Sequence, residues 1–327
     1  MARFRNFHSL LAVVWLVAGG CLAQAQTAAS YPSRAIAMIV PFPPGGPTDT
    51  YARMVAAKMQ ERWGQPVVVE NRGGANGNLG GEAVAKSPAD GYTLFLTTNT
   101  VHSANPYLFK KLPYDPIKDF TAIGRFGYAP FVLAVKADFP AKNVQELMAY
   151  ARKPENKASY AYGNSTGQVA GAAFSSLSRL NASAVPYKST PQALTDLIGG
   201  QVTFLFVDLA SSRPHVQSGR VRALALSAEQ KSALAADLPT VAEQANLPGF
   251  DLAAWIGVVG PAGMPPAIVN KLSERLAAML VRKDVAERLV CLGVEAHPST
   301  AAELDAYMKK QLEGWGRKVK DAGIQPE

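Results

Sequence analysis

The sequence contains very little cysteine, only two residues among 327. Cys21 lies in an N-terminal segment with the pattern of a cleaved signal, so Cys291 is left alone and an internal disulfide or thiolate metal cluster is excluded. Cys291 stands in the apolar stretch RLVCLGV, a context that predicts a buried small hydrophobic residue. The four histidines are dispersed along the chain, and their spacing indicates no metal site.

Long apolar runs and dense clusters of charge are also missing. After residue 25 no segment reaches the roughly 18 apolar residues that a membrane-spanning helix needs. The formal net charge is +8, but lysine and arginine are scattered, so we expect no nucleic-acid partner. A mild positive bias suits a small anionic ligand. A hydrophobic content of 48% is typical of a globular protein, and the length allows two domains.

The N-terminus has the three parts of a secretory signal peptide. Arg3 and Arg5 provide positive charge, residues 10–18 form a short apolar run, and residues 23–25 are a small-x-small cleavage sequence, AQA. We therefore expect residues 1–25 to be removed as a signal peptide and the mature protein to lie in the periplasm. A lipoprotein signal ending at Cys21 is the alternative.

Strand-like and helix-like segments alternate along the rest of the chain. The runs FVLAV and VTFLFV are apolar throughout, which is typical of strands in parallel sheets covered by helices. The alternation predicts a doubly wound α/β fold, and this length favours two similar lobes over one large sheet. Asn143 with Glu146, and Thr300 with Glu303, have the spacing of capped helix starts. Strands are expected at 35–41, 66–70, 92–97, 131–135, 158–162, 184–187, 202–207, 221–226, 256–259 and 293–296.

The stretch VPFPPGGPTDT ends an apolar strand abruptly and begins a helix. Gly45 and Gly46 let the backbone approach a ligand closely, and Thr48 or Asp49 is positioned to cap the helix. Free amides and the helix dipole favour a carboxylate or a phosphate there. Because no GK[ST] follows and a proline removes one amide, a small carboxylate fits better. The alternative is an ordinary turn that needs glycine for its bend.

A second glycine-rich segment, NRGGANGNLGGE, follows the strand-like run PVVVE. Its glycines fall as G-x-x-G-x-x-G, and no acidic residue ends a strand at the distance that a dinucleotide site requires. We therefore interpret it as a loop that enters a helix beside a cleft.

Polar residues follow further strand-like runs, where ligands of α/β folds bind. Thr98, Asn99 and Thr100 are uncharged hydrogen-bonding groups, and GNST at 163–166 gives a second helix start that favours an anion. Lys188 either faces an anion or is solvated. Asp208 either caps the next helix or accepts a hydrogen bond from a ligand's ammonium or hydroxyl group.

Residues with the spacing of a catalytic centre are absent from the sequence. No serine, histidine and acid, and no paired carboxylates, are spaced in a way that indicates one. The polar groups cluster as binding groups instead, so we expect no enzymatic activity, no cofactor and no bound metal.

Several long segments together resemble one family of solute receptors. The segments are YPSRAIAMIVPFPPGGPTD, ERWGQPVVVENRGGANGNLGGEAVAKSPADGYTL, NPYLFKKLPYDPIKDF, VPYKSTPQALTDLIGGQV, RVRALAL and LPTVAEQANLPGFDLAAWIGVVGPAGMP. In this order they are similar to the substrate-binding proteins of tripartite tricarboxylate transporters, also called Bug receptors. The resemblance covers essentially the whole mature chain.

The resemblance implies a type II periplasmic binding protein, in which two doubly wound α/β lobes joined by two crossovers close on a ligand cleft. The crossovers are expected near 129–131 and 252–256, with 31–129 plus 254–327 as lobe 1 and 130–253 as lobe 2. Such receptors typically bind small carboxylates through helix N-termini, hydroxyls and backbone amides. A monomeric periplasmic receptor that delivers a carboxylate to membrane permease subunits is therefore expected. A ligand-sensing receptor for a signalling partner and a periplasmic hydrolase are the alternatives.

The presumed cleft departs from the usual family pattern at several positions. Pro47 stands where serine or glycine is common, and Ser189 replaces a frequent glycine. FVDLAS replaces the frequent F-D-N-L-P, which puts Val207 and Asp208 at the Asp and Asn positions. Asp208 in a pocket that otherwise favours anions suits a zwitterion or a hydroxyacid better than a plain dicarboxylate. The ligand-binding residues are expected to be Pro43, Gly45, Gly46, Thr48, Asp49, Thr98, Asn99, Thr100, Tyr162, Asn164, Ser165, Thr166, Tyr187, Lys188 and Asp208.

Overall fold

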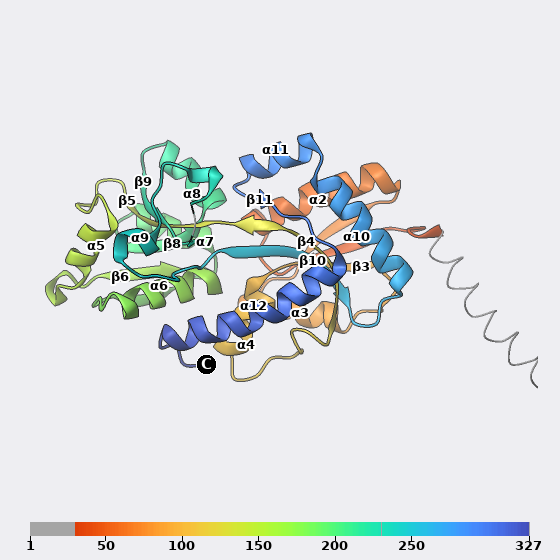
Figure 1. The fold of residues 1–327 in the computed structure, drawn as a ribbon, viewed down its shortest axis with the longest axis horizontal. Coiled ribbons are helices and arrows are strands. Elements are labelled where there is room, and N and C mark those ends of the chain that lie inside the picture. The colour runs from red at the N-terminus through yellow and green to blue at the C-terminus, as the bar shows by residue number, and fades with distance from the viewer. Residues whose placement is uncertain (1–29, 230, 327) are drawn as a thin grey trace, which may run out of the picture.

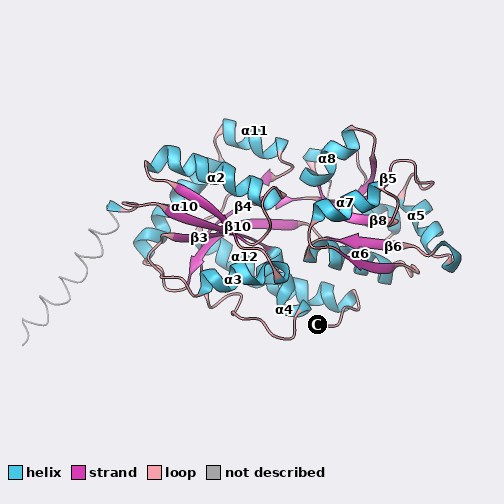
Figure 2. Cartoon of the chain, turned by 180° about the vertical axis from the view of Figure 1, so that it is seen from behind, coloured by secondary structure: helices cyan, strands magenta, loops and turns pink. Residues whose placement is uncertain are grey.

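The computed structural model describes residues 30–229 and 231–326, and the predicted signal peptide at 1–25 lies outside this part of the chain. Two sheets, each with helices packed around it, form the two lobes of the molecule (Figure 1). Figure 2 shows the same arrangement from behind, with the strands inside each lobe and the helices outside. Within the described residues, no helix is both long and apolar enough to cross a membrane.

The sheet of the first lobe has six strands in the order β11-β4-β10-β3-β1-β2. β1 pairs in parallel with β2 and β3, whereas β10 is antiparallel to β3 and β4. The sheet is mixed because β4 leads out of this lobe and β10 returns to it. The strands are β1 (Ile36–Val40), β2 (Val67–Asn71), β3 (Thr93–Thr98), β4 (Phe120–Ala129), β10 (Ala254–Pro261) and β11 (Glu295–Ala296).

The helices of the first lobe come from both ends of the chain. They are α2 (Pro47–Trp63), α3 (Asn78–Ala85), α4 (Asn105–Leu108), α10 (Pro266–Leu280), α11 (Lys283–Cys291) and α12 (Ala301–Asp321), with short helical turns η1 (Ala75–Gly77) and η2 (Thr100–Ala104). The C-terminal helix α12 packs against α4 and η2 of this lobe and also against α6 of the second lobe. It therefore spans the junction between the lobes.

The sheet of the second lobe has five strands in the order β7-β6-β8-β5-β9. β6 is parallel to β7 and β8, and β5 is antiparallel to β8 and β9. The apolar runs FVLAV and VTFLFV lie in β5 and β8, so the prediction that they pair in parallel is wrong. β5 enters this lobe directly from β4 and runs against the strands that follow it. The strands are β5 (Phe131–Lys136), β6 (Ser159–Tyr162), β7 (Ser183–Pro186), β8 (Phe204–Asp208) and β9 (Val221–Leu226). The helices are α5 (Val144–Ala151), α6 (Ser165–Leu177), α7 (Thr190–Ile198), α8 (Leu209–Gln217) and α9 (Val241–Ala245), with turns η3 (Pro154–Asn156) and η4 (Ala233–Ala235).

The chain passes between the two sheets twice (Figure 1). β4 ends at Ala129 in the first sheet and β5 begins at Phe131 in the second. β9 ends at Leu226 in the second sheet and β10 begins at Ala254 in the first. The lobe bounds 31–129 plus 254–327 and 130–253 stay a prediction.

The sequence pattern does not indicate β4, the strand that leads into the second lobe. Its residues, FTAIGRFGYA, include two glycines, a residue type that is depleted in strands. Gly127 is required at its position, because a Cβ atom there would overlap with the carbonyl oxygen of Glu295 on the neighbouring strand β11. The close approach of the two backbones therefore requires a glycine, and this glycine lowers the strand propensity of the sequence, so the propensity rules do not predict β4.

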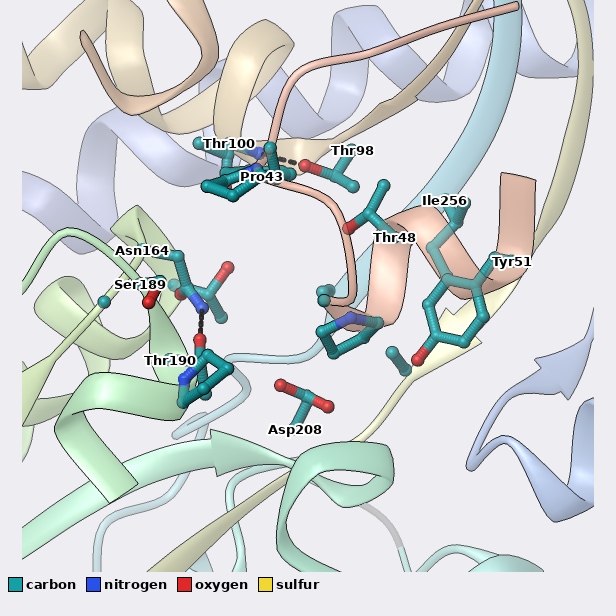
Figure 3. Close-up of a pocket in the computed structure, with 18 of the residues that line it drawn as sticks. Pro43, Thr48, Tyr51, Thr98, Thr100, Asn164, Ser189, Thr190, Asp208 and Ile256 are labelled. Atoms are coloured by element: carbon teal, nitrogen blue, oxygen red, sulfur yellow. Dashed lines mark hydrogen bonds between the residues drawn. The ribbon is translucent and has the colours of Figure 1, made fainter. Parts of the chain in front are cut away.

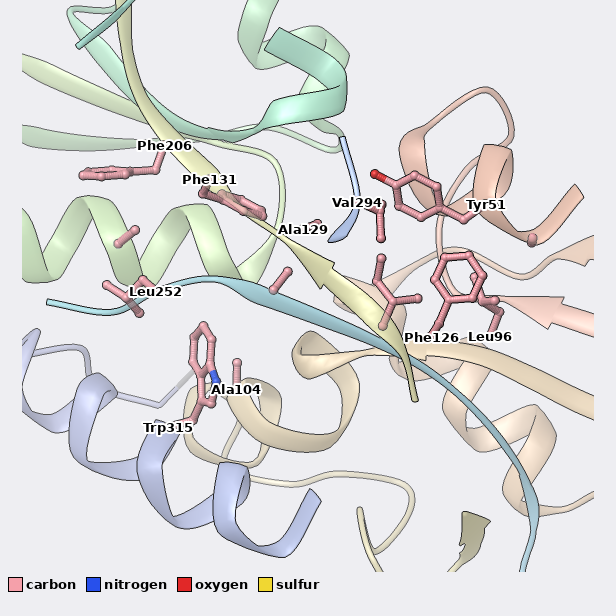
Figure 4. Close-up of a cluster of buried hydrophobic side chains, with 14 of the residues drawn as sticks. Tyr51, Leu96, Ala104, Phe126, Ala129, Phe131, Phe206, Leu252, Val294 and Trp315 are labelled. Atoms are coloured by element: carbon pink, nitrogen blue, oxygen red, sulfur yellow. The ribbon is translucent and has the colours of Figure 1, made fainter. Parts of the chain in front are cut away.

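One large hydrophobic cluster runs through the junction of the lobes (Figure 4). Phe131 and Phe206 come from the second sheet, and Phe126 comes from the first. Trp315 on α12 is only 1% exposed and lies in the same cluster as Leu252. Hydrophobic packing therefore holds the lobes together in addition to the two strands that connect them.

Two predicted helix caps are confirmed, and one burial prediction is wrong. Asn143 accepts a hydrogen bond from the amide of Glu146 at 2.8 Å, and Thr300 with Glu303 forms a reciprocal capping box. Cys291 is exposed at the end of α11 instead of buried. It lies two residues after the buried Leu289, which places it on the opposite face of the helix.

Candidate functional site

A cavity of about 120 Å³ lies between the two lobes (Figure 3). It has room for on the order of ten water-sized groups, which is the size of a small metabolite. Its walls combine the loops after β1, β3, β6 and β8 with residues of the two segments that connect the lobes. The cavity therefore has the position expected for a ligand site in a two-lobed α/β protein.

Four helices begin at this cavity. The first-turn amides of a helix have no partner within the helix, and they carry the positive end of its dipole. Asp208 already places a carboxylate at the start of α8, and the convergence of the other three ends favours an anionic group in the cavity. The lining residues at the helix starts are Gly46, Pro47 and Thr48 of α2, Asn164 and Thr166 of α6, Ser189 and Thr190 of α7, and Asp208 before α8.

The start of α2 differs in detail from the sequence-based expectation. The N-cap is Gly46, which makes no side-chain hydrogen bond, so neither Thr48 nor Asp49 caps the helix. Gly45 has a φ of 81°, a left-handed conformation that favours glycine. The amides at this helix start are therefore left without a side-chain cap, as an anion site requires.

Asp49 does not line the cavity but braces the loop that precedes α2. Its carboxylate accepts hydrogen bonds from the Gly45 amide and the Asn71 side chain, each at 3.0 Å, and pairs with Arg53 at 3.0 Å. Burial opposes ionisation, but the hydrogen bonds from Arg53, Gly45 and Asn71 outweigh it and lower the pKa of Asp49. The ionised carboxylate therefore holds the loop in place from outside the cavity.

The second lobe brings the starts of α6 and α7 together at Gly163. A Cβ atom at this position would overlap with the backbone of Ser189, so only glycine permits the approach. Asn164 caps α6 by accepting from the Gly167 amide at 2.9 Å, and its side-chain nitrogen donates to Thr190 Oγ1 at 3.1 Å. One asparagine therefore fixes the first turns of both helices.

Uncharged side chains join the two lobes beside the cavity. Asn99 Nδ2 donates to Thr166 Oγ1 at 2.8 Å. Ser165 Oγ donates to Asn105 Oδ1 at 2.8 Å and accepts from the side chain of Asn76. Ser165 and Thr166 are the first residues of α6, whereas their three partners belong to the first lobe. The start of α6 is therefore a point of contact between the lobes.

Asp208 is a buried carboxylate at the floor of the cavity. It is 5% exposed, and its Oδ1 atom accepts from the amide of Ser211 at 2.8 Å, which caps α8. Figure 3 shows the carboxylate directed into the cavity, with the hydroxyl group of Tyr51 on the same side. Burial raises the pKa of Asp208, against the hydrogen bonds of Ser211. The side chain caps a helix and lines the cavity at once.

Ten of the expected binding residues line the cavity and five do not. Those that line it are Pro43, Gly46, Thr48, Thr98, Asn99, Thr100, Asn164, Thr166, Lys188 and Asp208. Gly45, Asp49, Tyr162, Ser165 and Tyr187 lie outside the lining. Tyr187 donates instead to Asp196 at 2.6 Å. Contact of the lining residues with a ligand stays a prediction.

Sequence reasoning missed the lining residues of the segments that connect the lobes. Ala129 and Phe131 flank the first crossing, and Ala254 and Ile256 follow the second. These residues could have been predicted from their place in the expected crossovers, because a segment that connects two lobes borders the cleft between them. Tyr51 lies one helical turn after Pro47, and this spacing places both on one face of α2. The start of α7, with Ser189, Thr190 and Pro191, was a third helix start of the same kind.

The hydroxyl groups at the cavity pair with amides and not with an imidazole. Thr166 bonds to Asn99, and Thr190 bonds to Asn164. His102 lies outside the lining, 0% exposed, with Nδ1 at 2.7 Å from the carbonyl oxygen of Pro116. Burial lowers the pKa of His102 to about 4. In the described part of the chain, no group of three or more potential metal ligands is present.

Two lobes that are joined by two strands and enclose a cavity ringed by helix starts define a solute receptor of the two-lobed type. The family model described as "Tripartite tricarboxylate transporter family receptor" matches residues 51–324. The chain belongs to this receptor family, and the family and fold expected from the sequence are confirmed.

Individual relatives match over nearly their full length. Protein BugT of Bordetella pertussis is 33% identical over 324 residues, covering 97% of this chain and 98% of that protein. The solved structure of R. palustris Rpa4515 with adipate has a TM-score of 0.86 and 33% identity, covering 91% of this chain and 100% of that one. MatC (Rpa3494) from Rhodopseudomonas palustris with bound malate has a TM-score of 0.82 and 32% identity, covering 88% and 100%.

Proposed function

We propose that this protein is a non-catalytic periplasmic receptor that binds a small organic carboxylate between its lobes and delivers it to a membrane permease. The observation that carries the proposal is the convergence of the starts of α2, α6 and α7 on one cavity between the lobes. Each favourable interaction of an anion with a helix terminus contributes about 0.3–1 kcal/mol at exposed sites, and up to ~2 kcal/mol where it is partly buried. A carboxylate in the cavity would add several such contributions.

Three further facts support this function. The chain belongs to a transporter receptor family. Two of its structural neighbours hold adipate and malate, both carboxylates. The N-terminal sequence has the pattern of a secretory signal. A ligand that touches both lobes stabilises their closed arrangement through its higher affinity for that state.

The test is a melting-temperature screen of residues 26–327, followed by calorimetry. The screen should contain mono-, di- and tricarboxylates, amino acids, and the amide of each ligand. The protein should first be unfolded and refolded to remove any ligand that copurifies. At 100-fold excess over Kd, a ligand stabilises the native state by about 2.7 kcal/mol. Stabilisation that disappears on amidation supports a carboxylate receptor, and no stabilisation by any carboxylate contradicts it.

A charge variant locates the site. Thr48 lines the cavity with its hydroxyl group directed inward (Figure 3), so Thr48→Glu should weaken binding at least tenfold by adding a like charge. Thr195→Glu makes the same change on the exposed side of α7 and serves as the control. Equal affinity of the two variants would place binding elsewhere.

A further inference from the structure

The charged groups at the cavity differ in sign and in exposure. Two of the lining residues carry charge, namely Lys188, which is exposed, and Asp208, which is 5% exposed. The remaining lining residues are apolar or carry hydroxyl, phenol or amide groups. A negative charge therefore lies at the buried end of a cavity whose helix starts otherwise favour an anion.

The carboxylate of Asp208 faces the cavity, and no cation among the described residues pairs with it. Ser211 bonds to this carboxylate through its amide, at 2.8 Å from Oδ1, and through its side chain, and both donors are uncharged. The surroundings on this side are uncharged: Phe131 is paired with Asp208 across the sheet, Ala254 and Ile256 complete the wall, and Tyr51 adds a phenol group. A buried carboxylate without a counter-ion is unfavourable unless a partner compensates its charge.

We propose, on the basis of the carboxylate-receptor function above, that the ligand also carries a protonated nitrogen that pairs with Asp208. The ligand is then an amino acid or another short aminated carboxylate. Its carboxylate lies against the starts of α2 and α6, and its ammonium group lies against Asp208. A hydroxyl group would fill a hydrogen-bonding position but leave the charge uncompensated. A plain dicarboxylate would bring a second negative charge toward Asp208.

The test is calorimetry of refolded protein with ligands of matched chain length. One such set is butanoate, 4-aminobutanoate and butanedioate, to which the α-amino acids are added. Asp208→Asn and Asp208→Ser both remove the charge and keep a residue type that caps helices, so α8 retains its N-cap. Asp138→Asn is the control, because Asp138 is an exposed residue that pairs with Lys136 at 2.8 Å.

Aminated ligands should bind best to the wild-type protein. Both Asp208 variants should weaken them by about tenfold to a hundredfold, the usual effect of losing a hydrogen bond to a charged group. Ligands without nitrogen should bind the same variants as tightly as the wild type or more tightly, because they lose no contact and the like charge of Asp208 is removed. Asp138→Asn should leave every affinity unchanged.

Three results would overturn the proposal, and they are distinguishable. In the first, the wild type prefers a dicarboxylate, and Asp208→Asn binds it equally or more tightly. This result would support the carboxylate-receptor function and contradict the proposal of an aminated ligand. In the second, no carboxylate binds, aminated or not, and both proposals fail together. Proton uptake with a dicarboxylate that is lost in Asp208→Asn, measured in buffers of different ionisation enthalpy, would also overturn the aminated ligand.

Discussion

At the scale of single residues, two buried carboxylates near the cavity respond to acid in opposite directions. Hydrogen bonds hold the pKa of Asp49 below its ordinary value, whereas burial raises the pKa of Asp208. Asp49 therefore stabilises the native state when it is ionised, and Asp208 destabilises it when it is ionised. Asp49 holds the loop before α2 in place, and Asp208 places a carboxylate where a ligand can contact it.

Replacing Asp208 should stabilise the ligand-free protein at neutral pH. A raised native pKa means that the native state binds the proton more tightly, so the free energy of unfolding falls as pH rises above the unfolded value. Asp208→Asn removes this cost and keeps the cap, and we expect a gain on the order of 1 kcal/mol at pH 7. Urea denaturation should show the gain shrinking as the pH approaches 3.8, the ordinary value for the group. A variant less stable than the wild type at pH 7 would contradict this.

Replacing Asp49 should destabilise the native protein at neutral pH, the opposite of the effect expected for Asp208. Asp49→Ala removes a buried acceptor of three hydrogen bonds and should lower the free energy of unfolding by about 1–3 kcal/mol at pH 7. Because the native pKa is lowered, this contribution is present above 3.8 and is lost as the pH falls through the native value. Urea titrations at pH 7 and pH 3 test this, with Asp305→Ala as a control. Asp305 forms an exposed pair with Lys309, so its loss should cost less than about 1 kcal/mol.

At the scale of elements, the start of α6 has two roles. Asn164 and Thr166 at this start line the cavity, and the hydroxyl groups of Ser165 and Thr166 bond to the first lobe. These bonds join neutral groups and do not depend on charge. We infer that this helix start contributes to holding the lobes in contact.

Removing one of these hydroxyl groups should loosen the contact between the lobes. Thr166→Val leaves the side-chain nitrogen of Asn99 without its acceptor, at a cost of about 1–3 kcal/mol to the state in which the lobes touch. Small-angle scattering of the ligand-free variant should give a larger radius of gyration than the wild type. Thr195→Val on the exposed side of α7 is the matched control. Identical scattering from wild type and Thr166→Val would show that the bond does not hold the lobes.

Capping rules predicted helix starts correctly where a side chain forms a hydrogen bond with the backbone a few residues away. The caps at Asn143 and Thr300 follow from such rules, and both are present. The N-cap at Gly46 was missed because a glycine gives no side-chain signal. β4 was missed for a related reason, since Gly127 is required by a neighbouring strand that is distant in the sequence.

At the scale of the whole molecule, the position of the cavity could be predicted but part of its lining could not. Residues at the carboxyl ends of strands, such as Thr98 and Asp208, were expected at the site because strand ends gather at one edge of a sheet. Phe131 and Ile256 lie within strands and gave no such signal. Only the path of the chain between the lobes brings them to the cavity.

The junction of the lobes should also be a major source of stability. Trp315 is 1% exposed within the hydrophobic cluster that runs through the junction, and Trp315→Ala should cost about 3–5 kcal/mol of unfolding free energy. Trp63, which is only partly buried at the end of α2, gives a matched Trp→Ala control with a smaller loss. Guanidinium denaturation measures both. A loss below about 1 kcal/mol for Trp315→Ala would show that α12 merely covers the junction.

The strand order of the first sheet has a consequence for how the chain folds. β4 pairs with β10 and β11, which are synthesised only after the whole second sheet. Pairing across so long a loop is slow compared with local pairing, so β1, β2 and β3, and separately the second sheet, should form first. Pulsed hydrogen exchange during refolding should protect 204–226 before 120–129, and the reverse order would contradict this. The ligand cavity would then be completed only when the last third of the chain has folded.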